Sequence, residues 1–365
     1  MKVNRSGLTP RPLTPVRRRV TVKDVALRAG VTQPAVSVVL NGARSNTLVS
    51  DLTRQKILQA AKELGYRPNL SAQTMRSGKS RMIGVLLRNN SRAKYDETMA
   101  HPLTYEMVLG INEGLEQAGY MMSLVRLSDV DPDLHRQNSA FQGHLLDGLI
   151  IVSDIAAATP ERLEQLVPHS VWLDSTVWHE TNCIQRDELA VGHCVGRALA
   201  DAGYQDWIYL SRPPAIPASH EHYSRVGRQA GVTAIARQVN ANLQFVEHGF
   251  DTEMEAGFIK QLKPNTGLIM SDPYFIPLVT RAAMRARRCP GEDFALICCD
   301  EDFSSSGYSW ADLSHVRFPR FLMGVRAAQM MISLLDDPEP RARSEVVRHE
   351  YWPGSTVPPC PQKKS

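Results

Sequence analysis

Residues 21–41 read TVKDVALRAGVTQPAVSVVLN, and this stretch decides the fold of the N-terminal part of the chain. Thr21 can cap a helix, and Asp24 stands three residues later, as in a capping box. Apolar residues recur at helical spacing as far as Gly30, which ends the helix because glycine readily adopts the left-handed conformation. Thr32 then caps a second helix. Two short helices joined by a glycine-containing turn predict a helix-turn-helix.

The sequence around this stretch extends it into a three-helix, basic head over residues 20–67. A third helix is predicted from Ser50 to about Leu64. Residues 1–80 hold 15 Lys and Arg against three acids, a net +12, whereas the remainder holds 27 against 35, a net −8. A basic module on an acidic body is typical of nucleic-acid binding, although charge alone is equally compatible with a solvated basic face.

Two short segments flank the head. Residues 1–19 are rich in Pro, Arg, Ser and Thr and have little to bury, so we expect a disordered basic arm. Residues 68–80 have helical potential but are too few to form a stable helix alone, so this hinge segment needs a partner or DNA to fold. It is not a phosphate-binding P-loop, because Gln73 stands where that motif requires glycine and no strand precedes it.

From Arg81 onward, continuous apolar strands alternate with helices, which predicts parallel sheets in an α/β fold. The predicted strands are 82–87, 121–127, 147–152, 170–173, 207–210, 243–248, 267–270 and 294–298, and the helices given bounds are 103–118 and 133–146. There are too many strands for one comfortable sheet. We therefore expect two similar subdomains over residues 81–335, followed by a C-terminal tail segment, 336–365. Ligands of such folds bind beyond the carboxyl ends of the strands.

Several function classes lack support in the sequence. No stretch approaches 18 apolar residues and the N-terminus has no apolar signal core, so we expect neither a membrane span nor secretion, and the predicted compartment is the cytoplasm. The six cysteines show no C-x-x-C spacing and are expected to be reduced. The sequence contains no recognisable spacing of metal ligands, no glycine-rich phosphate-binding loop and no Ser/His/Asp arrangement typical of a catalytic triad. We therefore predict no metal, no cofactor and no enzymatic activity.

The head closely resembles that of the lactose/galactose repressor (LacI/GalR) family of transcription regulators. The matching head and hinge residues are Thr21-x-x-Asp24-Val25-Ala26-x-x-Ala29-Gly30-Val31-Thr32 and Gly65-Tyr66-x-Pro68-Asn69-x-x-Ala72-x-x-Met75. Weaker matches follow in the family's order, at Asp147-Gly148-Leu149-Ile150, Arg228-x-x-Gly231 and Val316-Arg317-x-Pro319. The resemblance spans about residues 20–335, nearly the whole folded chain.

The resemblance implies an α + α/β protein: a helix-turn-helix head with a hinge helix, then a periplasmic-binding-protein-like (type I) domain of two α/β subdomains. It implies a homodimer or tetramer on a pseudo-palindromic double-stranded operator, with a small-molecule effector between the subdomains. A repressor is the family expectation, and an activator or dual regulator is the alternative. Two alternatives come from other classes of protein. A periplasmic-type sugar-binding protein would need a signal peptide and would have no use for the head at residues 20–80. An α/β enzyme would need a recognisable arrangement of catalytic residues.

The resemblance also assigns DNA contacts. The family's phosphate-holding positions are matched by hydroxyl and amide side chains, at Thr21, Thr32, Ser37 and Asn41, although both threonines are also needed as caps. Base recognition would fall to Gln33, Pro34 and Val38. Gln33 can pair bidentately with adenine, whereas Val38 departs from the arginine that many members carry. In the hinge the matched positions are Asn69, Ala72 and Met75, and Met75 would act as an apolar wedge in the minor groove.

Effector contacts are expected beyond the strand ends of the body. The candidates are Arg228, Asp300, Ser271, Asp272, His222 and Tyr274. A guanidinium and a carboxylate could orient the hydroxyl or carboxylate groups of a ligand, and structural salt bridges are the equally weighted alternative. Ser271 is shorter than the family's usual asparagine, which puts a polyol contact there in doubt. His220-x-His222 lacks the acidic or cysteine company of a metal site. The effector's identity is not predicted.

Overall fold

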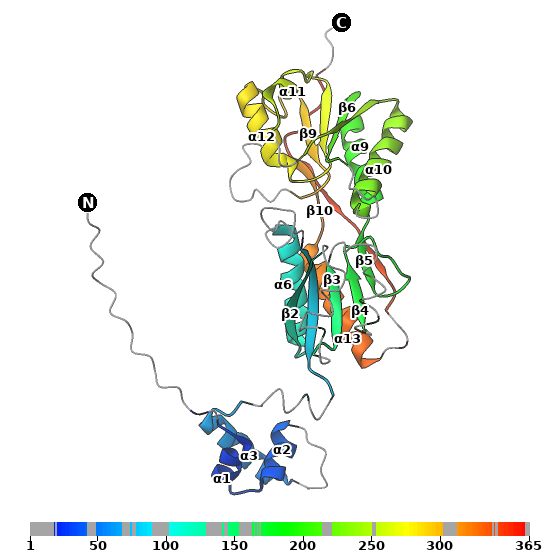
Figure 1. The fold of residues 1–365 in the computed structure, drawn as a ribbon. Coiled ribbons are helices and arrows are strands. Elements are labelled where there is room, and N and C mark those ends of the chain that lie inside the picture. The colour runs from blue at the N-terminus through cyan, green and yellow to red at the C-terminus, as the bar shows by residue number, and fades with distance from the viewer. Residues whose placement is uncertain are drawn as a thin grey trace, which may run out of the picture. The chain divides into compact units, whose positions relative to one another are not determined.

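The chain forms two compact units, Met1–Ser80 and Arg81–Ser365, in a computed structural model (Figure 1). The described residues are 20–41, 49–67, 78–89, 102–128, 145–152, 169–213, 221–249, 253–301, 312–337 and 342–361, with the single residues 18, 74, 141, 163, 165, 167 and 339. Each unit has its own apolar core and is described by itself.

The first unit is the three-helix head. Its helices are α1 (Val22–Ala29), α2 (Gln33–Asn41) and α3 (Asp51–Leu64). Thr21 and Asp24 form the predicted capping box, Ser50 caps α3, and Gly30 ends α1 in the left-handed conformation. Seven buried residues from all three helices form the core: Val25, Ala26, Ala35, Val36, Ile57, Ala60 and Ala61. The local capping signals and the apolar spacing therefore placed these helices correctly.

The second unit contains two six-stranded sheets, one in each of two subdomains. The first sheet has the order β11-β5-β4-β3-β1-β2. Its strands are β1 (Met82–Asn89), β2 (Met121–Ser128), β3 (Gly148–Val152), β4 (Ser170–Leu173), β5 (Cys183–Arg186) and β11 (Glu345–Val347), and all of them pair in parallel. With helices α6 (Pro102–Gln117) and α13 (Arg320–Asp336) this sheet makes up the first subdomain.

Glycines let helices α6 and α13 pack with their backbones in contact. A Cβ atom added at Gly110 would lie 1.9 Å from the carbonyl oxygen of Phe321, and one added at Gly324 would lie 2.1 Å from that of Met107. Any larger residue at either position would force the helices apart.

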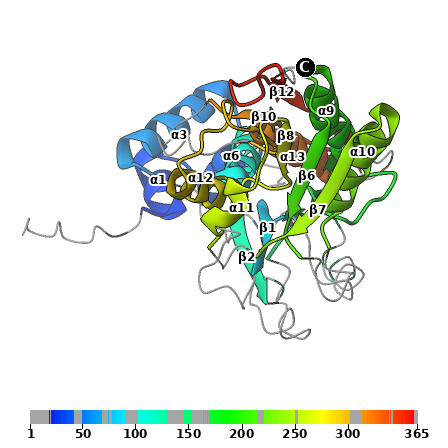
Figure 2. The same ribbon diagram turned by 90° about the horizontal axis from the view of Figure 1, so that it is seen from above.

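The second sheet has the order β12-β10-β9-β8-β6-β7 and belongs to the second subdomain. Its strands are β6 (Asp206–Ser211), β7 (Asn242–Glu247), β8 (Thr266–Met270), β9 (Ala295–Cys298), β10 (Ser314–Arg317) and β12 (Glu350–Trp352). Its helices are α9 (Glu188–Asp201), α10 (Tyr223–Val239), α11 (Ala256–Lys260) and α12 (Phe275–Ala286). Figure 2 shows α9 and α10 on one side of this sheet and α11 and α12 on the other. Alternate strand residues accordingly enter two different apolar clusters, with Ile269 in one and Leu268 in the other.

All eight predicted strands are present, with ends that differ by no more than two residues, and the predicted helix 103–118 corresponds to α6. The predicted helix 133–146 lies mostly outside the described residues. Four strands that the described residues contain were not predicted: β5, β10, β11 and β12. Each has only three or four residues and includes a charged residue, so none forms an apolar run like that of β4.

The segment expected to be a C-terminal tail is part of both sheets, so the second unit extends beyond the expected end at residue 335. Strand β11 pairs in parallel with β5, and β12 pairs antiparallel with β10. The Cys360 amide then donates to the Ala202 carbonyl at 2.7 Å. The error arose because these two edge strands have only three residues each and both begin with a glutamate, so neither forms an apolar run that stands out in the sequence.

Two further observations concern the described residues as a whole. None of their helices combines the length and apolar character needed to cross a bilayer. Among the same residues, no group of three or more His, Cys, Asp and Glu side chains is arranged to hold a metal ion.

Candidate nucleic-acid interface and ligand site

Helix α2 presents its first turn outward. Thr32, Gln33 and Pro34 are exposed, whereas Ser37 and Val38 are half-buried. The opposite side of α2 is buried in the core of the head. The first residues predicted to recognise bases therefore lie at the accessible N-terminal end of a helix on a basic domain. Insertion of a recognition helix into the major groove requires such an accessible end.

Thr21 is tied to its own helix. Its hydroxyl and its amide both donate to Asp24 Oδ2, at 2.7 and 2.8 Å, and the hydroxyl accepts from the Asp24 amide at 3.3 Å. Hydrogen bonds from the side chain and then from the backbone of Thr21 lower the pKa of Asp24. Thr21 would have to release Asp24 to donate to a phosphate, so capping is the role that the geometry shows.

The remaining DNA candidates are not described. The side chain of Asn41, at the end of α2, and the hinge residues Asn69, Ala72 and Met75 lie outside the described residues. Within the hinge segment, Thr74 is described, and its carbonyl accepts from the Gly78 amide at 2.9 Å.

In the second unit, six charged side chains are buried together at the boundary between the two subdomains. We call them the charged cluster: Asp174, Arg186, Glu188, Arg228, Asp300 and Arg320. Three are positive and three negative, so the cluster is internally neutral. Buried charges are stable only when they are paired and hydrogen-bonded, which is the case here.

Arg228, on α10, is held entirely by protein acceptors. Its Nε lies 2.7 Å from Glu188 Oε2, and its Nη2 lies 2.9 Å from Glu188 Oε1 and 2.5 Å from Asp300 Oδ2. Its Nη1 donates to the Ser271 carbonyl at 2.6 Å. Burial would lower the pKa of Arg228, but the two carboxylates outweigh burial and raise it well above its usual value. The predicted ligand-binding arginine is thus fixed by its neighbours.

Asp300, which follows β9, accepts hydrogen bonds from three arginines. Arg186 Nη1 lies 3.0 Å from Oδ2, Arg228 shares that oxygen, and Arg320 donates to Oδ1. Burial would raise the pKa of Asp300, but the three guanidinium groups, that of Arg320 most strongly, hold it well below its usual value. Asp300 therefore stays ionised although its side chain is buried.

Asp174 links the end of β4 to the start of α10. It accepts from Arg186 Nε at 2.9 Å and from the Tyr223 hydroxyl at 2.7 Å. His222 caps α10, and its Nε2 lies 3.0 Å from the Asp174 carbonyl oxygen. The predicted effector candidate His222 is therefore part of a contact between the subdomains.

Two carboxylates at the edge of the charged cluster remain partly open. The side chain of Asp272 is 27% exposed and accepts from the Ser271 hydroxyl at 2.8 Å. Glu301 is 22% exposed and accepts from Arg320 Nη1 at 3.1 Å. Burial raises the pKa of Glu301, against the opposing effect of Arg320. Tyr274, the last candidate, is half-buried at the start of α12.

The structure thus brings Arg228, Asp300, Ser271 and Asp272 into one network, and it places His222 beside that network through Asp174. Sequence analysis missed Asp174, Arg186, Glu188 and Arg320. A signal was available for Asp174 and Arg186, because both stand at the carboxyl ends of parallel strands, where ligands of such folds bind. For Arg186 it could not be used because β5 was not predicted, whereas Asp174 directly follows a predicted strand and was overlooked.

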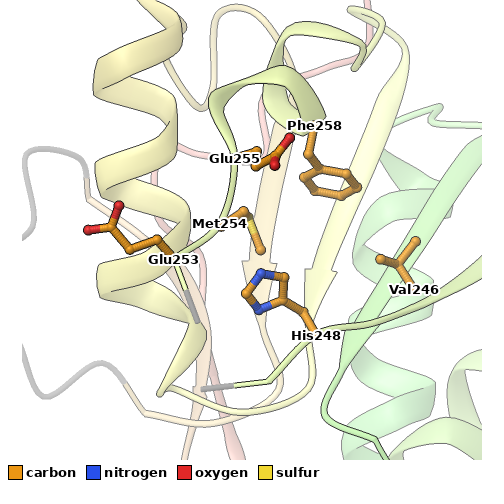
Figure 3. Close-up of a pocket in the computed structure, with 6 residues that line it drawn as sticks. All are labelled: Val246, His248, Glu253, Met254, Glu255 and Phe258. Carbon is orange, nitrogen blue, oxygen red and sulfur yellow. The ribbon is translucent and has the colours of Figure 1, made fainter. Parts of the chain in front are cut away.

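A separate hollow of about 350 Å³ lies on the second subdomain, between the end of β7 and α11 (Figure 3). Its lining residues are Val246, His248, Glu253, Met254, Glu255 and Phe258. Glu253 is already paired with Arg285 at 2.7 Å. None of the predicted effector residues lines this hollow.

Two parts of the chain match models of known protein families. Residues 21–69 match the model of bacterial regulatory proteins of the lacI family. The head of the chain is therefore similar to the lacI-family domain over its whole length. Residues 197–357 match the model of the periplasmic binding protein-like domain, and this match includes β11 and β12. The sequence resemblance and the expected fold class are thereby confirmed.

Relatives and a solved structure resemble this protein over most of its chain. It is 25% identical over 323 residues to the ribose operon repressor of Bacillus subtilis, covering 86% of this chain and 91% of the relative. It is 28% identical over 243 residues to the HTH-type transcriptional regulator PtxS of Pseudomonas plecoglossicida, covering 63% and 66%. The lac repressor dimer bound to operator and the anti-inducer ONPF superposes with a TM-score of 0.72 at 20% identity, covering 93% and 100%. By their names these two relatives are a repressor and a transcriptional regulator, which agrees with the predicted class of function.

Proposed function

We propose that this protein binds a pseudo-palindromic operator as a homodimer and represses transcription under the control of a small molecule. The observation that carries the proposal is the exposed first turn of α2 on a basic head that matches the LacI family. Each protomer would place α2 in one half-site, so the symmetry of the dimer sets that of the operator. The proposed compartment is the cytoplasm, where the operator is.

Recognition of the operator is assigned to the accessible side of α2. Gln33, Pro34 and Val38 contact bases, and Thr32 and Ser37 hold phosphates that set the register. Asn41 and the hinge residues complete the DNA contacts, with Met75 as the wedge. Thr21 contributes by fixing the start of α1, because its donors are engaged by Asp24.

The effector is proposed to be a sugar-like or other small metabolite bound at the edge of the charged cluster. The regulator CelR has been solved with cellobiose, at a TM-score of 0.62 and 18% identity. In this chain Asp272 and Glu301 are the carboxylates of the cluster's edge with exposed surface. Arg228, Asp300 and Ser271 position the edge, and His222 and Tyr274 stand at the starts of α10 and α12.

A binding selection with the full chain on randomised duplex DNA tests the proposal. We expect enrichment of palindromic sites whose affinity falls steeply with salt, because the phosphate contacts release counterions. Repeating the selection with a metabolite library identifies the effector as the compound that changes operator affinity. A complete lack of sequence preference would contradict the proposed function.

A further inference from the structure

Three chain crossings connect the two subdomains of the second unit. The chain passes from β5 to α9, from β10 to α13 and from β11 to β12. Arg186 is the last residue of β5, and Arg320 is the first residue of α13. Both arginines therefore stand where the chain leaves or enters the first subdomain.

Asp300 joins the subdomains through these arginines. It belongs to the second subdomain, as does Arg228, but it also accepts from Arg186 and Arg320 of the first. Arg186 Nη1 lies 2.9 Å from Glu188 Oε1 at the start of α9, which adds a second ionic contact across the same boundary. All of these side chains are at least nine-tenths buried.

A hydrogen-bonded contact lies beside the ionic one. The Tyr223 hydroxyl donates to Asp174 at 2.7 Å and accepts from the Arg186 backbone amide at 2.9 Å. Asp174 and Arg186 belong to the first subdomain, and Tyr223 begins α10 of the second. The Arg186 amide is thus protected from solvent only while the two subdomains stay together.

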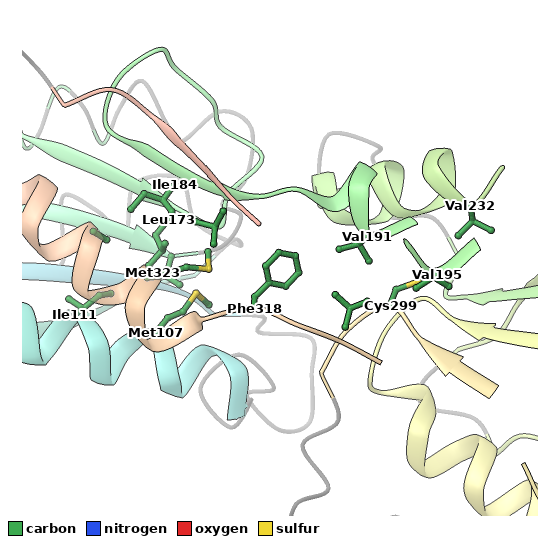
Figure 4. Packing of buried hydrophobic residues seen from close by; sticks show 14 of the residues in the cluster. Met107, Ile111, Leu173, Ile184, Val191, Val195, Val232, Cys299, Phe318 and Met323 are labelled. Carbon is green, nitrogen blue, oxygen red and sulfur yellow. The ribbon is translucent and has the colours of Figure 1, made fainter. Parts of the chain in front are cut away.

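Phe318 fills the same boundary with apolar surface (Figure 4). It is buried, and it stands on the crossing from β10 to α13. The guanidinium carbons of Arg186 and Arg320 lie 5.2 and 5.7 Å from the centre of its ring. Figure 4 shows Met323 on one side of Phe318 and Cys299 on the other, so the ring joins the apolar cores of the two subdomains.

We propose that Asp300 is the hub of an ion lock that holds the two subdomains in this arrangement without any ligand. The lock consists of Asp300 with Arg186, Arg228 and Arg320, and Phe318 packs against it. Separating the subdomains at this boundary breaks these charge-assisted hydrogen bonds together and exposes the Phe318 ring to water. An effector that moves the subdomains must therefore break or replace contacts of the lock.

The test uses the full chain with neither DNA nor metabolite present. Asp300→Asn removes the charge of the hub, and we expect hydrogen exchange in peptides containing the Arg186 amide to accelerate about 100-fold. X-ray scattering is expected to show an expanded second unit. Wild-type exchange together with wild-type scattering would overturn the lock.

A second variant keeps the test decisive if Asp300→Asn does not fold. Asp300→Asn combined with Arg320→Met removes one negative and one positive partner, so the cluster stays neutral. If the single variant does not fold, the double variant decides between faster exchange, which supports the lock, and unchanged exchange, which contradicts it. Arg285→Gln is the matched control, because it breaks an exposed ion pair with Glu253 inside one subdomain and should change neither readout. Since no DNA is involved, the result is independent of the proposed function.

Discussion

Arg228 and Glu188 form a two-pronged ion pair, with Nε 2.7 Å from Oε2 and Nη2 2.9 Å from Oε1, although both side chains are almost completely buried. Parallel hydrogen bonds of this kind fix the plane of the guanidinium group. The pair therefore sets the orientation of an arginine that sequence analysis assigned to the effector.

Glu188→Ala should destabilise the second unit by about 3–5 kcal/mol, because it leaves a buried guanidinium group short of its main partner. Urea unfolding of the full chain measures the change. Glu188→Leu combined with Arg228→Met should recover most of the loss. An exposed pair gives the comparison: Glu253→Gln should have little effect. If Glu188→Ala changes the free energy of unfolding only slightly, Asp300 alone is a sufficient ion-pair partner for the Arg228 guanidinium group.

Val38→Arg should create a preference for G·C at one base pair of each half-site. Arginine pairs bidentately with guanine, and such a pair contributes about 1–3 kcal/mol of discrimination. A randomised-operator selection with wild type and variant measures the preference. Leu58→Arg, at an exposed position of α3, adds the same charge elsewhere on the head and should only raise general affinity. An unchanged base preference in Val38→Arg would place residue 38 away from the bases.

Thr21→Ala should weaken the start of α1 by about 1 kcal/mol, the usual cost of losing a helix cap. Faster hydrogen exchange in the first turn of α1 would report this in DNA-free protein. Thr21→Ser keeps the hydroxyl and should restore protection. If exchange in α1 is normal while operator affinity drops, Thr21 acts as a phosphate ligand and not as a cap.

Acid should destabilise the second unit through Asp174 and Asp300. Burial opposes ionisation of Asp174, but Arg186, His222 and Tyr223 outweigh burial and lower its pKa well below the usual value. A carboxyl whose pKa is lower in the folded state stabilises the fold above its unfolded pKa of about 3.9, and this contribution is lost as the pH falls below that value. Urea midpoints measured from pH 7 to pH 3 test this. In Asp174→Asn the urea midpoint should fall less steeply with decreasing pH than in the wild type. An equally steep fall would mean that other groups cause the loss of stability in acid.

The parts of the structure that could be predicted are those determined by residues close together in the sequence. Thr21 and Ser50 mark helix starts because a cap is a contact between near neighbours, and the long apolar runs of β1 and β3 mark buried strands. The charged cluster has no such local cause. Arg186 and Asp300 are separated by 114 residues, and nothing near either one indicates its partner. Buried pairing was left open as an alternative for Arg228 and Asp300, and only the folded topology supplied the partners.

Strand β11 gives the chain an unusual order of assembly. It completes the edge of the first sheet beside β5, yet Glu345 is translated 159 residues after Arg186. At roughly 5–20 residues per second, a nascent chain leaves the edge of β5 uncovered for roughly 10–30 s. An open edge is a template for pairing with other chains. The first subdomain is therefore complete only after Glu345–Val347 has been synthesised, and until then the open edge of β5 favours association with other nascent chains.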